Sequence, residues 1–250
     1  MLLMPVREEA IVYGVNAALA VARHRSEALL RVFHTRERRK VVGPLLSAAA
    51  ISRRPYREVT SDELTRIAKT LHHEGVVVVC QPMPLVPFEA LLAGLPISSV
   101  VVALDEIGNP HNLGAILRSA AFFGANAVLY PSAERQAHLS PAALRVAQGG
   151  AETVSCTAVS DLGAALRALT ARGFECVAAD PEGGRALVDH VFRRPTCIVL
   201  GNEGEGLSPS VRKACTVRLS IGVPGQTASV ESLNVSVAAG ILLSRAFLAS

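Results

Sequence analysis

The chain has 250 residues, half of them hydrophobic, so it is long enough to bury a large core in one domain or two. Its cysteines are scattered, without a Cys-x-x-Cys pair or zinc-ligand spacing, and residues 1–6 are too short an apolar run for a signal peptide. These features disfavour a disulfide-stapled secreted domain, and we expect reduced thiols, no bound metal and a cytoplasmic location. The cysteines are Cys80, Cys156, Cys176, Cys197 and Cys215.

Positive charge is concentrated in the first third of the chain. Residues 1–81 hold 13 Lys and Arg against 8 Asp and Glu, whereas residues 82–250 hold 12 against 13. This asymmetry indicates that the first third meets a polyanion, although a solvated helix face is the alternative. Because aromatic residues are not interleaved with the charges, phosphate contacts are favoured over base stacking. The candidate contact residues are Arg36, Arg38, Arg39, Lys40, Arg53 and Arg54.

The same first third, residues 1–81, is predicted to form a compact α/β domain. Apolar periodicity predicts helices at 15–23 and 38–50, a helix opening at Ser61, and strands at 29–33, 56–59 and 75–79. Four prolines then mark residues 82–97 as a stiff linker, with a short helix at 88–92.

Residues 98–250 are predicted to form a second, larger α/β domain. Strands alternate with helices along it, which implies a mostly parallel sheet covered on both faces. The last helix, from about residue 233, has polar residues within its apolar run, so we expect a buried amphipathic helix and no membrane partner. The strand candidates are 99–104, 126–130, 153–157, 174–179, 196–200 and 216–221.

The first strand of this domain leads through a polar turn into a helix, where α/β proteins place their ligands. Asn109 or Asn112 is a candidate helix cap, and Arg118 lies one to two turns further on, long enough to reach back. Taken alone, such residues are usually a cap and a solvated cation.

Two later stretches repeat the pattern of strand, loop and helix. Residues 197–208 run from a buried strand into Gly201-Asn-Glu-Gly-Glu-Gly206, and residues 219–240 pass through a Pro/Gly loop to Ser232 and Asn234. The glycine order G-x-x-G-x-G is not the dinucleotide fingerprint, and no P-loop is present.

Together these three stretches resemble motifs 1, 2 and 3 of the SpoU/TrmH family in the SPOUT class of RNA 2′-O-ribose methyltransferases. The matching patterns are Asn112-x-Gly114-x-x-x-Arg118, Gly201-Asn-Glu203-x-x-Gly206 and Ser232-Leu-Asn-Val235. Residues 1–79, with Tyr13-Gly-Val-Asn16, are similar to the family's small substrate-binding domain, which has a ribosomal-protein-like α/β fold.

The resemblance implies a trefoil knot in the C-terminal domain, a homodimer whose active site draws on both subunits, and S-adenosylmethionine (AdoMet) as methyl donor. It implies donor contacts from Leu200, Gly201, Gly206, Ile221, Val223 and Leu233, with Ile221 and Val223 competing for one role. The implied catalytic residues are Arg118, Asn112, Glu203, Ser232 and Asn234.

Arg118 matches the family's catalytic arginine. A guanidinium holds its proton too tightly to act as a base, so we expect Arg118 to anchor a phosphate and stabilise the developing alkoxide. Asn112 and Glu203 are expected to orient it and the ribose. A non-catalytic RNA-binding protein with the same fold is the alternative, and the choice between tRNA and rRNA stays open.

Overall fold

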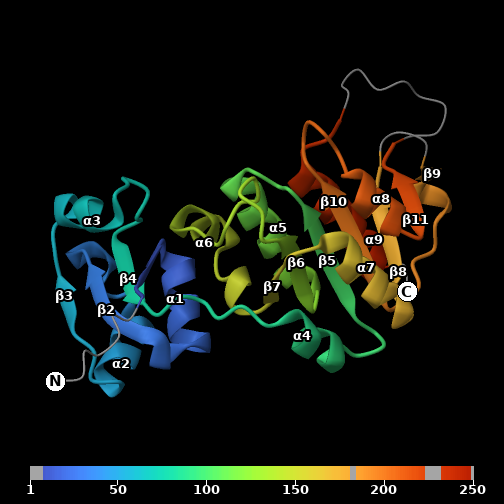
Figure 1. Ribbon diagram of the computed structural model, residues 1–250. Coiled ribbons are helices and arrows are strands. Elements are labelled where there is room, and N and C mark those ends of the chain that lie inside the picture. The colour runs from blue at the N-terminus through green and yellow to red at the C-terminus, as the bar shows by residue number, and fades with distance from the viewer. Residues whose placement is uncertain (1–7, 181–183, 223–231, 249–250) are drawn as a thin grey trace. The chain divides into compact units, whose positions relative to one another are not determined.

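The computed structural model describes residues 8–180, 184–222 and 232–248 (Figure 1). The chain divides into two compact units, each described below by itself. Unit 1 comprises Met1–Pro84 and Leu139–Thr153, and unit 2 comprises Leu85–His138 and Val154–Ser250. Both units are α/β, as the sequence predicts.

Unit 1 is built on a four-stranded sheet in the order β1-β4-β2-β3. The central strand β4 is a run of four valines and a cysteine, all buried, antiparallel to β1 and β2. β-Branched side chains favour this pleated, enclosed position. The strands are β1 (Ala10–Tyr13), β2 (Leu29–His34), β3 (Tyr56–Glu58) and β4 (Val76–Cys80). The predicted strands match β2, β3 and β4, whereas the four-residue β1 was not predicted.

The predicted helices of unit 1 are confirmed, except that one of them starts later than predicted. α3 begins with a capping box in which the Thr60 hydroxyl accepts the Glu63 N–H and the Glu63 carboxylate accepts the Thr60 N–H. The predicted helix over 38–50 is wrong at its beginning, because 3₁₀ turn η2 comes first and α2 starts at Gly43, with Pro44 in its first turn. The helical elements are α1 (Val15–His24), η1 (Ser26–Ala28), η2 (Arg36–Arg38), α2 (Gly43–Ile51), α3 (Ser61–Ala68), α6 (Pro141–Ala147) and η3 (Gly150–Glu152).

The segment Leu139–Thr153 packs in unit 1, although it follows β6 of the larger sheet along the chain. A buried ion pair fastens it: Arg25 Nε lies 2.5 Å from Glu152 Oε2, with side chains 13% and 4% exposed. Arg25 also donates to the carbonyl of Gln81 at 3.1 Å. At Gly149, whose φ is +92°, a Cβ atom would lie 2.5 Å from that of Ala20, so only glycine permits this approach.

Unit 2 is built on a parallel sheet whose described strands follow the order β7-β6-β5-β10-β8-β11-β9. All six predicted strands are confirmed to within two residues, and only the two-residue edge strand β9 was not predicted. The strands are β5 (Val100–Asp105), β6 (Ala127–Pro131), β7 (Ser155–Val159), β8 (Glu175–Ala179), β9 (Arg185–Ala186), β10 (Thr196–Gly201) and β11 (Val217–Ser220).

Helices cover both faces of this sheet (Figure 1). α4 (Phe88–Gly94), α7 (Leu162–Ala171) and α8 (Pro209–Ala214) pack on one face, around a core that includes Leu166 and Val199. α5 (Pro110–Phe123) and α9 (Val235–Leu248) pack on each other, and α9 lies against β10; the 3₁₀ turn η4 spans Leu187–Asp189.

Helices α5 and α9 run in the same direction. Asn112 and Asn234 are hydrogen bonded near the two helix starts, and the rings of Phe123 and Phe247 stack near the ends with centroids 6.2 Å apart. Asn109, one of the two predicted alternatives, is the N-cap of α5: its side chain accepts the His111 N–H at 2.8 Å.

The strand order reverses between β5 and β10, which are fully parallel neighbours in register from Val100 and Thr196 to Asp105 and Gly201. The loops that follow both strands therefore leave the same edge at a topological switch point, where open α/β sheets bind ligands. The connection from β11 to α9 includes residues 223–231, outside the described residues, so the trefoil knot stays a prediction.

In the part of the chain that the structure describes, no helix is both long and apolar enough to cross a membrane. No group of three or more His, Cys, Asp or Glu side chains in that part is placed to hold a metal ion. None of the five cysteines, all of which the structure describes, forms a disulfide; Cys215 is half-buried and the other four are buried.

Candidate active site

Three loops that are far apart in the sequence meet through side-chain hydrogen bonds. Asn112, in the first turn of α5, donates through Nδ2 to Glu203 Oε1 in the loop after β10. Asn234 donates through Nδ2 to Asn112 Oδ1 at 3.1 Å, and its own Oδ1 accepts the Ser236 N–H at the start of α9. Three of the five predicted catalytic residues thus form one chain of hydrogen bonds.

The loop after β10 is held in shape by its own backbone and by β5. Asn202 and Gly206 exchange two backbone hydrogen bonds of 3.0 Å. The Asn202 side chain accepts the Gly204 N–H and donates to the carbonyl of Glu106 at 2.8 Å. Asp105, buried at the end of β5, accepts the Ser208 N–H at 2.6 Å. The loop is therefore preorganised against the neighbouring strand.

Gly201 has to be glycine. A Cβ atom there would lie 2.4 Å from the carbonyl carbon of Gly206 and 2.6 Å from the Leu207 nitrogen, both backbone atoms. Gly206 has φ +71°, the left-handed region in which glycine is strain-free. The two glycines let the loop fold back closely over the end of β10.

Outside this loop, Arg135 bridges two carboxylates. Its Nη2 donates to Glu205 Oε1 at 2.7 Å, and its Nη1 lies 3.3 Å from Glu106 Oε2. This hydrogen bond and the positive charge of Arg135 lower the pKa of the Glu205 carboxyl group below its usual value. No pattern in the sequence predicts this bridge, because Arg135 lies in a loop without a motif.

A cavity of about 530 Å³ lies beside the loop, within the usual size range of small-molecule sites. Its walls combine aliphatic side chains with glycine backbone. Five of the six predicted donor contacts line it, together with Glu203 and Ser232 from the predicted catalytic set. The five are Leu200, Gly201, Gly206, Ile221 and Leu233. Val223 lies outside the described residues, so its competition with Ile221 is not decided.

Three charged residues outside the predicted site also line the cavity: Asp180, Glu205 and Arg212. Asp180 directly follows β8 at the carboxyl edge of the sheet, so its place after a predicted strand was an available signal.

Arg118 is placed differently from the other predicted catalytic residues. It does not line the cavity, and it makes no hydrogen bond or ion pair with the described residues. Residues 112 and 118 are six positions apart on α5, which turns their side chains about 120° from each other around the helix. Asn112 and Glu203 therefore bind each other, not Arg118, within one chain, and Arg118 lies on the exposed face that carries Phe122.

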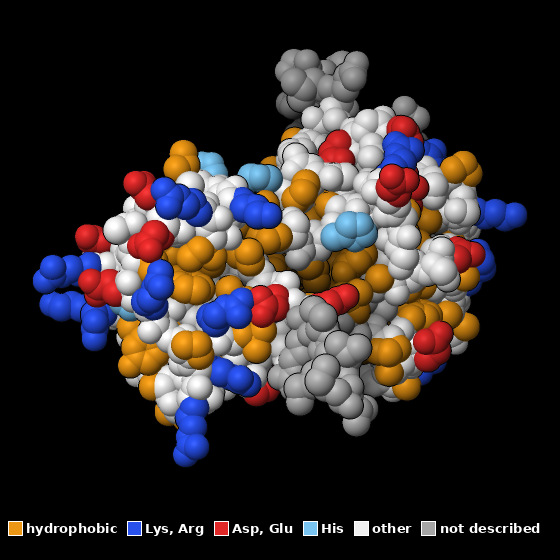
Figure 2. Space-filling model, turned by 60° about the vertical axis from the view of Figure 1, so that its left-hand side comes forward, with side chains coloured by type: hydrophobic (Ala, Val, Ile, Leu, Met, Phe, Trp, Pro, Cys, Tyr) orange, Lys and Arg blue, Asp and Glu red, His pale blue; other side chains and the backbone are white. Residues whose placement is uncertain are grey.

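The predicted basic contacts are on the surface of unit 1, where Figure 2 shows Lys and Arg side chains standing out in blue. Arg36, Arg38, Arg39 and Lys40 are exposed at η2 and the turn after it, and Arg53 is exposed beyond α2. Arg54 is half-buried. Arg39 lies 3.6 Å from Glu58 on β3, an exposed pair that is too weak to withhold the guanidinium from a phosphate.

Comparison with known proteins supports the resemblance to the SpoU/TrmH family over nearly the whole chain. The SpoU rRNA methylase family model matches residues 99–244, and a model for RNA 2′-O ribose methyltransferase substrate binding matches residues 11–85. The chain is 34% identical over 235 residues to the 23S rRNA (guanosine-2′-O-)-methyltransferase RlmB of Ralstonia nicotianae, covering 93% of each protein. It is 31% identical to the Pseudomonas putida protein of the same name, again covering 93% of both.

A solved structure agrees in fold. The SpoU methyltransferase AviRb from Streptomyces viridochromogenes, in complex with the cofactor AdoMet, superposes with a TM-score of 0.78 at 26% identity, covering 96% of this chain and 90% of AviRb. The two family models, the relatives and the hydrogen-bonded convergence of the three motif loops lead to one conclusion. The chain belongs to the SpoU rRNA methylase family.

Proposed function

We propose that this chain transfers a methyl group from AdoMet to a ribose 2′-hydroxyl of ribosomal RNA. The observation that carries the proposal is the convergence of Asn112, Glu203 and Asn234 beside the cavity lined by Gly201 and Leu233. Relatives that align over 93% of their length are named as 23S rRNA guanosine-2′-O-methyltransferases, which favours rRNA over tRNA. The proposed place of action is the cytoplasm.

The cavity fits AdoMet. Its aliphatic walls, which include Leu200, Leu219 and Leu233, suit an adenine ring, and the backbone of Gly201–Gly206 offers N–H and C=O groups to polar edges. When bound, AdoMet supplies the electrophilic sulfonium methyl group. The chain's own contribution is to hold the ribose hydroxyl in line with that methyl group and to stabilise negative charge on the oxygen as its proton leaves.

Arg118 is proposed to act on RNA bound at the site of a second copy of the chain. It is exposed on α5 together with Phe122, which is 83% exposed. On the adjoining helix α9, Val237 and Leu248 are 50% and 77% exposed. Large exposed apolar side chains on two packed helices favour a subunit interface, and a two-fold dimer would bring each Arg118 to its partner. There a guanidinium binds phosphate and stabilises the developing alkoxide.

The basic residues of unit 1 are proposed to bind the RNA backbone. Exposed Arg36, Arg38, Arg39 and Lys40 supply phosphate contacts without reading base edges, so they position the RNA instead of selecting a sequence. The division into an RNA-binding domain at 1–81, a linker at 82–97 and a catalytic domain at 98–250 is part of this proposal, with Leu139–Thr153 of the last range packed in unit 1.

The test is methyl transfer from labelled AdoMet to purified 23S rRNA and, separately, to total tRNA, followed by mapping of the modified ribose. We expect label in rRNA at a single 2′-hydroxyl. Label only in tRNA would overturn the choice of substrate. If calorimetry also detected no AdoMet binding with or without RNA, the alternative of a non-catalytic RNA-binding protein would replace the proposal.

A further inference from the structure

A buried carboxylate lines the cavity at a position that the family motifs do not include. Asp180 follows the last residue of β8, is 2% exposed, and its backbone N–H donates to the carbonyl of Leu219 on β11 at 2.9 Å. In the strand order, β8 and β5 lie on opposite sides of β10, and β5 binds the end of the loop that follows β10. Asp180, which follows β8, therefore lines the cavity on the side away from β5.

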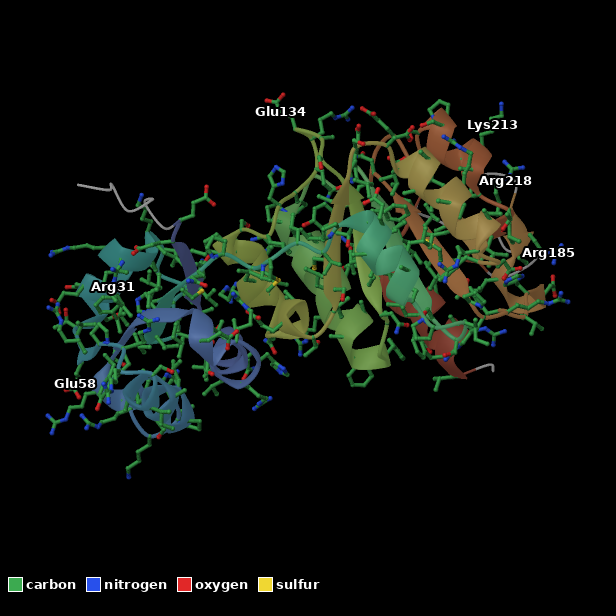
Figure 3. All side chains as sticks on the ribbon, turned by 60° about the horizontal axis from the view of Figure 1, so that its bottom comes forward. Arg31, Glu58, Glu134, Arg185, Lys213 and Arg218 are labelled. Atoms are coloured by element: carbon green, nitrogen blue, oxygen red, sulfur yellow. The ribbon has the colours of Figure 1, made fainter. Side chains whose placement is uncertain are left out.

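Two guanidinium groups balance this carboxylate. Asp180 Oδ2 lies 3.7 Å from Arg212 Nε on α8 and 3.6 Å from Arg218 Nη1 on β11. Arg218, labelled in Figure 3, lies on β11, the strand that pairs with β9. Burying a carboxylate is costly, and two guanidinium groups beside it offset part of that cost. A carboxylate held in place at the wall of a cavity with aliphatic side chains is the kind of polar group that orients a ligand.

The ligand group must donate hydrogen bonds, because a carboxylate can only accept them. AdoMet offers three such groups: the 6-amino group of adenine, the neutral ribose diol and the positive α-ammonium. Asp180, Glu203, Glu205 and Arg212 all line the cavity, so its charge does not decide among these groups, and the choice of the diol rests on the analogy with nucleotide-binding sheets. In nucleotide-binding parallel sheets, an acidic residue beyond the glycine-rich loop likewise accepts from a ribose hydroxyl.

We propose that Asp180 binds the ribose hydroxyls of the methyl donor, and that Arg212 and Arg218 are positioning residues that hold its carboxylate. This inference rests on the proposed use of AdoMet. The acceptor site is set by the Asp180 carboxylate, the wall of the cavity and the two ion pairs.

The experiment measures binding by calorimetry, without RNA, of two probes to wild type and Asp180→Asn. The probes are S-adenosylhomocysteine and 5′-methylthioadenosine, which keeps the ribose but lacks the amino-acid end. A hydrogen bond to a charged acceptor corresponds to about a 10- to 100-fold change in Kd. We expect Asp180→Asn to weaken both probes by this same factor. Asp161→Asn is the matched control, since Asp161 is an exposed N-cap of α7 and asparagine also caps helices.

The two probes separate the possible roles. Weaker binding of S-adenosylhomocysteine alone would assign Asp180 to the ammonium and overturn the proposal. Unchanged binding of both would reduce Asp180 to a structural tie between β8, α8 and β11, and would also overturn it. If wild type bound neither probe, the proposed function would fail first, and this inference with it.

A measurement on the wild-type protein tests the proposal even if the variant misfolds. An S-adenosylhomocysteine analogue that lacks both ribose hydroxyls should bind wild type about 10- to 100-fold more weakly than the parent compound. In Asp180→Asn, the two compounds should differ much less. Equal affinities for wild type would overturn the proposal whatever the variant's stability.

Discussion

Asn234 donates a hydrogen bond of 3.1 Å to Asn112, across 122 residues of chain. Asn112 in turn donates a hydrogen bond to Glu203, so its amide joins the starts of α5 and α9 to the loop after β10. The amide is a suitable junction because it offers a donor and an acceptor at the same time. The motif residues are thus held by one another before RNA arrives.

Replacing this junction should reduce catalysis more than stability. Asn112→Ala removes both side-chain bonds at a half-buried position, and we expect the single-turnover rate of methyl transfer to fall about 10- to 100-fold. Asn112→Asp is the companion variant, because it keeps the acceptor for Asn234 but places a second carboxylate against Glu203. A rate near wild type in Asn112→Ala would contradict the role of the junction.

Gly201→Ala should weaken donor binding. The added Cβ meets backbone atoms of Gly206 at 2.4 Å, so the loop itself must move, and overpacking of this kind costs about 1–3 kcal/mol. Calorimetry with S-adenosylhomocysteine and chemical denaturation measure the two effects. Gly94→Ala, near the end of α4 with no atom within 4 Å of the new Cβ, is the matched control and should leave both unchanged or slightly improved.

Glu152→Ala should be strongly destabilising. It leaves the Arg25 guanidinium, 13% exposed, without its partner, and breaking a buried pair costs about 3–5 kcal/mol. The urea midpoint of unfolding measures the loss. Glu9→Ala breaks a pair of equal length, Arg31 with Glu9, whose side chains are more than 40% exposed, and should cost about 1 kcal/mol or less. Equal losses would show that burial does not set the strength of the Arg25 pair.

The fold could be predicted from the sequence where apolar runs are long, and less well where contacts are non-local. The apolar runs of β4, β5 and β10 predict buried strands directly, whereas β1 and β9 are too short to give a pattern. The packing of Leu139–Thr153 in unit 1 depends on Arg25, more than 100 residues earlier, which local periodicity cannot reveal.

The candidate site shows the same division. Its glycines and amides stand in recognisable spacing, so Gly201, Asn112 and Asn234 could be named in advance. Asp180 and Arg135 form ion pairs with residues that are distant in the sequence, and no spacing along the chain predicts such pairs. The outward direction of Arg118 follows from helix geometry, but only once Asn109 is known as the cap.

Stability should decline with alkali partly because of Cys215. Burial raises the pKa of its thiol to about 12, whereas the pKa of a thiol in an unfolded chain is about 8.5. Between these values the unfolded state binds fewer protons, so the contribution to stability is complete below about pH 8.5 and is lost as the pH rises toward 12. Urea midpoints at pH 8 and pH 10 should therefore differ more for wild type than for Cys215→Ala. Equal differences would contradict the raised pKa.

Arg118→Ala should abolish methyl transfer and leave S-adenosylhomocysteine binding almost unchanged, because Arg118 does not line the cavity. Co-expression of Arg118→Ala with Gly201→Ala chains then tests whether the active site is shared between subunits. If each site takes Arg118 from one subunit and the cavity from the other, half of the dimers are mixed and hold one intact site, so about a quarter of the wild-type rate should return. If both residues serve the same chain, every site in a mixed dimer carries one defect and no rate returns. Methyl transfer to 23S rRNA by the tag-purified mixture distinguishes these outcomes, at an AdoMet concentration low enough that Gly201→Ala alone, with its weakened donor binding, is nearly inactive. Each variant alone is its control.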